Sequence, residues 1–502
     1  MNWKTSNYLL HRWIGITLGV MTFVWFGSGI AMMYYPWPAP TASEELARRP
    51  SFAFAGNDVI GFDSAIALTH DSTITSGRLM QWNGHLVYAL HGDAASGARA
   101  DRLLDATTGR VLSPITAADA VQVARSVVAN GVAVREVRVL SSGDHYLLSG
   151  EYRRGFPAYV IRFADRAGTA IYVSRAGGYI VGVVTDRTRW TTWLGTVPHW
   201  LYFKWLYTRH FDWWLWVSYV LPAIAMIAGL SGITIGVHQL LPHWRRGNWR
   251  VSAYRGASQW HHIAGIVFGA FVVTWSLSGL LEVLGPDASP TTEYVAAARG
   301  PGSPRYAIDE RAALASAARS LHMAAQAVAI DRTRLLGSPG YVVYLDAGHR
   351  AWVDGATGIV RADIGARAAA DVAARAIGFA GAPASVTRLS AYDTYYYARF
   401  HREMPLPAYR VAFADADRSV VYLDPVSGEP TGFVNDQVRR YRWMRDGLHS
   451  WDLGALNAHR ALWQAVVLPF MLGGTLVAAT GLWLVTRRLR RMRALSGAVV
   501  VD

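Results

Sequence analysis

Four long stretches of the chain are almost wholly apolar, and polar sequence separates them. They cover residues 8–35, 213–241, 259–284 and 462–485. Each is long enough for a helix to cross a bilayer, which takes roughly 20 residues. The intervening segments mix helix-like and strand-like patterns with turn signals, such as the D-A-T-T-G run that begins at Asp105. The pattern predicts four transmembrane helices and two large water-exposed domains, residues 42–209 and 285–457.

The first and third apolar stretches repeat one set of spaced residues. The first stretch contains His11, Gly15, Gly19, Trp25, Ser28 and Gly29. The third contains the same residue types 250 positions later, at His261, Gly265, Gly269, Trp275, Ser278 and Gly279. At about 100° per residue, the His, the spaced Gly and the Trp share a sector of roughly 120° on one helix face. Such a small, polar face is expected to point toward protein or a cofactor and not toward lipid.

The water-exposed segments repeat as well. The run P-A-Y-V-I-R-F-A-D at 157–165 recurs as P-A-Y-R-V-A-F-A-D at 407–415, and His199 recurs as His449. A nearly constant shift across helical and strand-like sequence predicts two internal repeats, each made of a span, a soluble domain and a second span. The expected fold is an α-helical membrane protein, with a four-helix transmembrane bundle, a pseudo-two-fold axis along the membrane normal and two α+β domains.

The charge distribution predicts how the chain lies in the membrane. The formal net charge is +14, and arginines gather in the loop 242–258 and the tail 486–502, beside apolar spans. Basic segments of this kind stay in the cytoplasm. Both termini are therefore expected to be cytoplasmic and both large domains periplasmic, and no nucleic-acid partner is predicted. The chain has no cysteine, so the 16 histidines are the expected ligands of any redox centre.

The order of these motifs resembles the PepSY-associated transmembrane family, whose members carry an H-x-x-x-G first helix and a later L-H before another span. The soluble parts are also similar to PepSY domains, which have a D-x-x-T/S-G hairpin. This chain has V-D-G-A-T-G at 353–358 and L-D-P-V-S-G at 423–428. The resemblance implies a bacterial inner-membrane protein with PepSY-like periplasmic domains. Some members of the family are haem-bearing reductases of ferric siderophores.

One histidine pair is expected near the cytoplasmic face. A b-type haem with two axial imidazoles needs two neutral histidines from facing helices, with small residues where the macrocycle lies. His11 and His261 occupy the same repeat position, so a two-fold axis would bring them face to face, and the spaced glycines would clear room. The alternative is that His11 is an interfacial residue beside Arg12, while the glycines serve helix packing. His262 is the rival of His261, although the spacing to Gly265 favours His261.

A second pair is expected toward the periplasm. Two repeat-related pairs qualify, His199 with His449 and His210 with His459, and the L-H motif of the family points to the first. The alternative is a belt of histidines and aromatic residues at the lipid headgroups. His238 and His243 are expected to be interfacial. Two haems, one near each face, would form an electron path across a bilayer about 30 Å thick.

These observations predict an inner-membrane di-haem protein that passes electrons to a periplasmic acceptor. The resemblance implies that the acceptor is a ferric siderophore, reduced from Fe(III) to Fe(II) during iron uptake. The sequence has no Rossmann glycine motif after a strand and no P-loop, so quinol or a separate reductase is the expected donor. Two alternatives stay open: a cofactor-free PepSY binding or regulatory module in the membrane, and a haem wire to a partner protein. No catalytic side chain is assigned.

Overall fold

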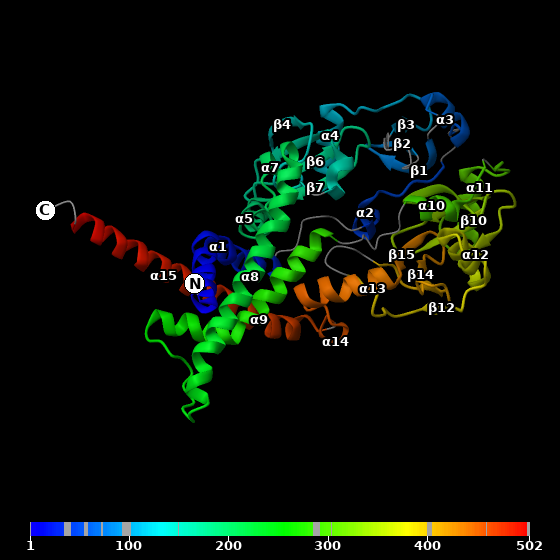
Figure 1. The fold of residues 1–502 in the computed structure, drawn as a ribbon. Helices are drawn as coiled ribbons and strands as arrows, with labels where there is room; N and C mark the ends of the chain where they lie inside the picture. Colours follow the sequence, from blue (N-terminus) through cyan, green and yellow to red (C-terminus); the bar gives the residue numbers. More distant parts are fainter. Residues whose placement is uncertain are drawn as a thin grey trace. The chain divides into compact units, whose positions relative to one another are not determined.

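A computed structural model describes residues 2–34, 42–54, 59–71, 74–92, 102–148, 150–284, 292–302, 304–398, 404–457 and 459–498. The chain divides into two compact units (Figure 1). The helical unit comprises Met1–Pro36, Thr188–Pro286 and Arg439–Asp502. The sheet unit comprises Trp37–Arg187 and Asp287–Val438. Residues 188–209 and 439–457, which sequence analysis assigned to the water-exposed domains, thus belong to the helical unit.

Four helices of the helical unit are long and apolar enough to cross a membrane. They are α1 (Trp3–Tyr34), α8 (Phe211–Trp244), α9 (Ala257–Leu284) and α15 (Arg460–Ala498). Their positions match the four predicted spans, which confirms a multi-pass membrane protein. Pro222, Pro242 and Pro469 lie inside α8 and α15. Spanning helices tolerate proline because neighbouring helices and side chains satisfy the freed carbonyls.

The four long helices pack in a closed ring. Helix α1 packs against α8 and α15, and α9 also packs against α8 and α15. Helices α1 and α9 therefore lie opposite each other across the ring. Phe26 of α1 meets Trp275 of α9 edge-on, with their ring centroids 5.4 Å apart, and both side chains are buried. Shorter helices precede α8 and α15 in the chain. They are α5 (Asp186–Leu194), α6 (Thr196–Trp200), α7 (Lys204–Arg209), α13 (Asp436–Arg442), the π-helical turn η3 (Trp443–Gly447) and α14 (Gly454–Asn457).

The sheet unit is built around a seven-stranded antiparallel sheet that takes strands from both halves of the chain. Its order is β11-β10-β9-β8-β1-β2-β3. The strands are β1 (Ile74–Trp82), β2 (His85–Gly92), β3 (Arg102–Asp105), β8 (Ala329–Leu335), β9 (Ser338–Tyr344), β10 (Arg350–Asp354) and β11 (Val360–Arg361). Strands β1 and β8 meet in the middle, so the two predicted soluble domains share one sheet.

An ion pair marks the place where the halves meet. Arg78 of β1 lies directly opposite Asp331 of β8. The guanidinium donates from Nε to Oδ1 at 2.5 Å and from a terminal nitrogen to Oδ2 at 2.7 Å. This two-point geometry is the strong form of the Arg–carboxylate interaction. The pair therefore fixes the register between strands that lie about 250 residues apart in the chain.

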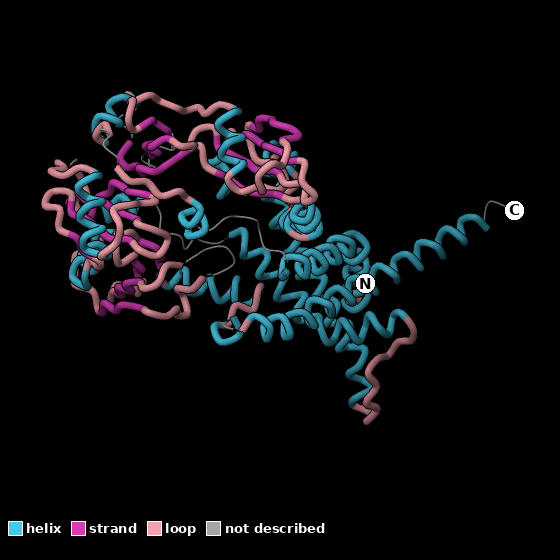
Figure 2. The backbone as a smooth tube through the Cα atoms, turned by 180° about the vertical axis from the view of Figure 1, so that it is seen from behind, coloured by secondary structure: helices cyan, strands magenta, loops and turns pink. Residues whose placement is uncertain are grey.

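Two four-stranded antiparallel sheets complete this unit. Figure 2 shows the strands in magenta. One sheet is β4 (Val134–Leu140), β5 (Ala158–Phe163), β6 (Ala170–Ser174) and β7 (Ile180–Val184). The other is β12 (Ser385–Leu389), β13 (Ala408–Ala412), β14 (Val420–Leu423) and β15 (Pro430–Val434). The helices of the unit are α2 (Ala42–Arg48), α3 (Phe62–Thr69), α4 (Ala117–Arg125), η2 (Gly150–Gly155), α10 (Thr292–Arg299), α11 (Glu310–Leu321) and α12 (Gly365–Ile377).

Local sequence explains the starts of several of these elements. Thr116 and Asp119 form a reciprocal capping box that begins α4. Asp309 caps α11 by accepting from the backbone N–H of Ala312. The hairpin between β1 and β2 turns at Asn83-Gly84, where both residues have positive φ, as a two-residue type I′ turn requires. These signals fix the elements that support the central sheet.

Candidate cofactor site

The first histidine pair joins opposite helices of the ring. His11 comes from α1 and His261 from α9, and their ring centroids lie 6.2 Å apart with the planes inclined at 44°. Nδ1 of His11 lies 3.0 Å from the carbonyl oxygen of Ala228 in α8. Nδ1 of His261 lies 3.1 Å from the carbonyl oxygen of Val477 in α15. Because a carbonyl only accepts, each Nδ1 carries the proton, and each Nε2 keeps its lone pair.

Glycines on α8 and α15 make this approach possible. A Cβ on Gly232 would lie 2.7 Å from Cε1 of His11, and a Cβ on Gly481 would lie 3.2 Å from Cε1 of His261. The two glycines stand 249 positions apart, each after a hydroxyl residue, Ser231 and Thr480. Neither glycine was among the predicted site residues, although a hydroxyl residue followed by glycine at both repeat positions is a usable signal.

The second pair lies at the other end of α1 and α9. His199 of α6 and His449, just after η3, have ring centroids 6.0 Å apart with the planes inclined at 70°. Nδ1 of His199 lies 3.0 Å from Oγ of Ser28, and Nδ1 of His449 lies 3.0 Å from Oγ of Ser278. Burial, and then the nearby His449, hold the pKa of His199 well below its ordinary value. The ring is therefore neutral, as a metal ligand must be.

The repeated Trp and Ser of the long helices hold these two histidines. The Ser28 hydroxyl donates to the Trp25 carbonyl at 3.1 Å, so its oxygen is left to accept from the imidazole. The Trp25 indole donates to the backbone carbonyl of His199 at 3.0 Å. Ser278 and Trp275 make the same contacts around His449, at 3.1 and 2.7 Å. The motif W-x-x-S therefore fixes both the backbone and the ring tautomer of a histidine about 171 residues away.

Both pairs have the spacing of a two-imidazole metal complex. A metal–imidazole bond is about 2 Å long and the ring centre lies roughly 1.2 Å beyond the nitrogen, so two axial rings have centroids about 6.3 Å apart. The observed separations are 6.2 and 6.0 Å. In all four rings Nδ1 is bound to protein, which is how an outer hydrogen bond orients a ligating histidine. The residues therefore fit a haem iron with two histidine ligands at each site.

Two glycines border open space beside the first pair. Gly15 and Gly265 lie one turn from His11 and His261 on the same helix face, and no other atom lies within 4 Å of where their Cβ would be. Gly19 and Gly269 differ, since a Cβ there would lie 3.0 Å from Leu482 and 2.8 Å from Ile233. The first glycine of each spaced pair thus borders open space, whereas the second is used for helix packing.

The remaining candidate histidines lie elsewhere. His262 is buried with both ring nitrogens in hydrogen bonds, to Ser252 and to the Gly236 carbonyl. His210 and His459 are both exposed, and among the described residues no ring contact joins them. His238 lies beside Trp3 at 5.7 Å. His261 and the pair His199/His449 are therefore the candidates that the geometry favours.

The two histidines of the second pair have different charged surroundings. Just before His449, Arg445 donates to Glu282 at 2.9 Å and to Asp446 at 2.7 Å. These acids raise the pKa of Arg445 against the lowering effect of its burial, so the guanidinium stays charged. The corresponding positions near His199 are Met32, Gly195 and Thr196, 250 residues earlier. The cluster beside His449 thus has no counterpart at the equivalent positions near His199.

No protein-family model matches the chain, and no curated protein matches it significantly. Among the described residues, no three His, Cys, Asp or Glu side chains gather as a metal-ligand group. The candidate site is therefore defined by the two histidine pairs and by the contacts that orient them.

Proposed function

We propose that the chain is a bacterial inner-membrane electron-transfer protein that binds two b-type haems. His11 and His261 would be the axial ligands at one site, and His199 and His449 at the other. The single observation that carries the proposal is the pair of ring separations, 6.2 and 6.0 Å, with each Nδ1 bound to protein. The same spacing at both ends of α1 and α9 is what two pairs of axial ligands require.

The spacing along the bundle supports transfer across a membrane. His11 and Ser28, which mark the two sites on α1, are 17 residues apart, or about 25 Å at 1.5 Å per residue. This length is close to the apolar thickness of a bilayer, about 30 Å. The bound groups would supply one-electron Fe(III)/Fe(II) chemistry. The chain's own part is to hold four neutral imidazoles in place and, through Phe26 and Trp275, to exclude water between the sites.

The finer parts of the proposal have separate support. The recurrence of Trp–His, Ser–His and Gly–His contacts after about 250 residues supports two internal repeats. The arginine-rich loop and tail support cytoplasmic termini and periplasmic PepSY-like domains. The acceptor, a ferric siderophore, and the donor, quinol or a separate reductase, rest on the motif resemblance alone. Reduction of such an acceptor consumes one electron per iron, which the donor loses.

Haem stoichiometry tests the proposal. The full-length protein is purified in detergent from haem-supplied cells, and pyridine-haemochrome and reduced-minus-oxidised spectra are recorded. We expect nearly two haems per chain, about one in His11→Ala and about one in His449→Ala. His210→Ala and His262→Ala are the matched controls and should keep both. A colourless wild type would overturn the proposal and favour a cofactor-free binding module, and retention of both haems in His11→Ala would reject the first site.

A further inference from the structure

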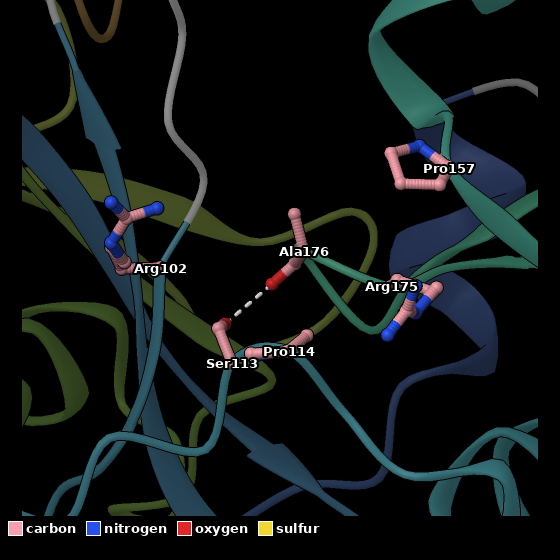
Figure 3. A pocket seen from close by; sticks show the side chains of 6 residues that line it. All are labelled: Arg102, Ser113, Pro114, Pro157, Arg175 and Ala176. Carbon is pink, nitrogen blue, oxygen red and sulfur yellow. Dashed lines mark hydrogen bonds between the residues drawn. The ribbon is translucent and has the colours of Figure 1, made fainter. Parts of the chain in front are cut away.

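A cavity of about 460 Å³ lies in the sheet unit, between the seven-stranded sheet and the sheet β4–β7. It is lined by Arg102, Ser113, Pro114, Pro157, Arg175 and Ala176. Figure 3 shows Arg102 on one side and Arg175 with Pro157 on the other. The volume is within the range of sites for small organic ligands, about 300–1,000 Å³. Its wall is mostly apolar, and of the lining residues that the structure describes two are arginines and none is an acid, so the charged groups at the cavity are positive.

Hydrogen bonds fix the frame of this cavity. The Ser113 hydroxyl accepts from the N–H of Leu103 at 2.7 Å and donates to the carbonyl of Ala176 at 2.6 Å, which ties β3 to the β6–β7 turn (Figure 3). The backbone of Arg175 is held on both sides, by Pro157 at 3.0 Å and by Ile115 at 2.9 Å. The frame is therefore formed before any ligand arrives, which lowers the entropic cost of binding.

The positive charge of the cavity is poorly compensated. Arg175 has no ion-pair partner among the described residues, and its Nε is buried without a hydrogen bond. It lies over the ring of Tyr159 at 5.5 Å. The carboxylate partner of Arg102 is Asp71, at 3.9 Å, the outer limit of an ion pair. Buried guanidinium nitrogens are costly unless they are paired.

The other half of the chain has an ion pair at the corresponding place. Ile364 donates to the carbonyl of Pro425 at 2.8 Å, just as Ile115 donates to the carbonyl of Arg175. One residue earlier, Asp424 occupies the position of Ser174 and forms an ion pair with Arg350 of β10. The second half therefore has a neutralising acid where the first half has a serine followed by an arginine.

We propose that this cavity binds a small organic oligocarboxylate. Each guanidinium presents a planar pair of donors that matches a carboxylate, and two arginines on opposite sides favour a ligand with at least two such groups. The ligand would supply the negative charge that Asp424 supplies in the second half. The site does not depend on haem binding.

Citrate is the probe. Binding to the full-length protein in detergent is measured by isothermal titration calorimetry at low ionic strength, with inorganic phosphate in parallel. We expect citrate to bind, and Arg175→Gln or Arg102→Gln to weaken it at least tenfold. Arg110→Gln, at an exposed arginine of the same unit, should change the affinity less than twofold.

A second variant keeps both arginines. Ala176→Glu places a carboxylate on the wall of the cavity, where it would engage the guanidiniums and exclude citrate. Loss of citrate binding in this variant, with an unchanged melting temperature, supports the proposal. No citrate binding by the wild type, equal binding by all variants, or phosphate binding as tight as citrate would overturn it. Haem content is measured on the same samples, so failure here is separable from failure of the haem proposal.

Discussion

Alanine at Gly232 is a sharp test of how the first histidine pair is held. The new Cβ would lie 2.7 Å from Cε1 of His11, about 0.7 Å short of the 3.4 Å at which ordinary contact begins. The ring is hydrogen-bonded to Ala228 of the same helix, so the imidazole must turn or α8 must shift. A metal–nitrogen bond is only about 2 Å long, so a displacement of this size misplaces Nε2.

The expected magnitudes form a series. Loss of ligand orientation typically lowers metal affinity about 10–100-fold, and we expect this for haem binding at the first site in Gly232→Ala. In Gly481→Ala the Cβ would lie 3.2 Å from His261, so an adjustment of a few tenths of an ångström suffices and the loss should be only a few-fold. Gly27→Ala is the control, since nothing lies within 4 Å of its Cβ and it faces roughly 160° away from His11.

Haem titration of apoprotein, followed at the Soret band, measures this series. The control should bind as the wild type does and gain up to about 1 kcal/mol of helix stability from the loss of glycine. The second site should titrate normally in every variant. Wild-type haem affinity in Gly232→Ala, or an equal loss in Gly27→Ala, would refute the assignment of His11 as an oriented ligand.

Three further predictions follow from other contacts. Gly15→Leu and Gly265→Leu fill the open space beside the first pair, so each should remove about one haem per chain in a pyridine-haemochrome assay, and full occupancy would show that the space serves another purpose. Ser278→Ala removes the acceptor of His449 Nδ1 and should weaken haem binding at the second site about 10–100-fold, with changed electron paramagnetic resonance g-values; an unchanged spectrum would contradict the role of the hydroxyl. Burial raises the pKa of Glu310 to about 7, so the stabilising effect of the protonated carboxyl is complete below about pH 4.5 and is lost as the pH rises through about 7. The melting temperature should therefore decline over this pH range, and Glu310→Gln should flatten the decline. An equal decline in the wild type and the variant would contradict the role of Glu310.

The sequence was most informative where a pattern of residues is compatible with one structure only. Length and apolar composition were enough for the four spans, because a helix of this kind has no stable alternative outside a membrane. The shared spacing around His11 and His261 brought two distant histidines to one helix face, and the structure places them together. Choosing between His261 and His262 needed the structure, since only there are both nitrogens of His262 seen in hydrogen bonds.

Other features had no local signature. Pairing of β1 with β8 joins strands that are 250 residues apart, and either strand could have formed the edge of its own sheet. Ser28 and Trp25 were visible as repeated residues, but their target, His199, lies in a different element far along the chain. Beside Arg175 the first half has Ser174 where the second half has Asp424, and this difference becomes visible only when the two halves are compared through their shared backbone contacts.

The ion pair between Arg78 and Asp331 affects which strands can pair at the centre of the seven-stranded sheet. The two residues stand opposite each other where the strands of the two halves meet. If one half paired with a copy of itself, arginine would face arginine, or aspartate would face aspartate, and like charges directly opposite are destabilising. The halves are thus complementary and no longer interchangeable. Pairing of β1 with β8 is therefore favoured over pairing of either strand with a copy of itself. This preference disfavours strand exchange between neighbouring molecules and keeps the two halves of one chain paired with each other.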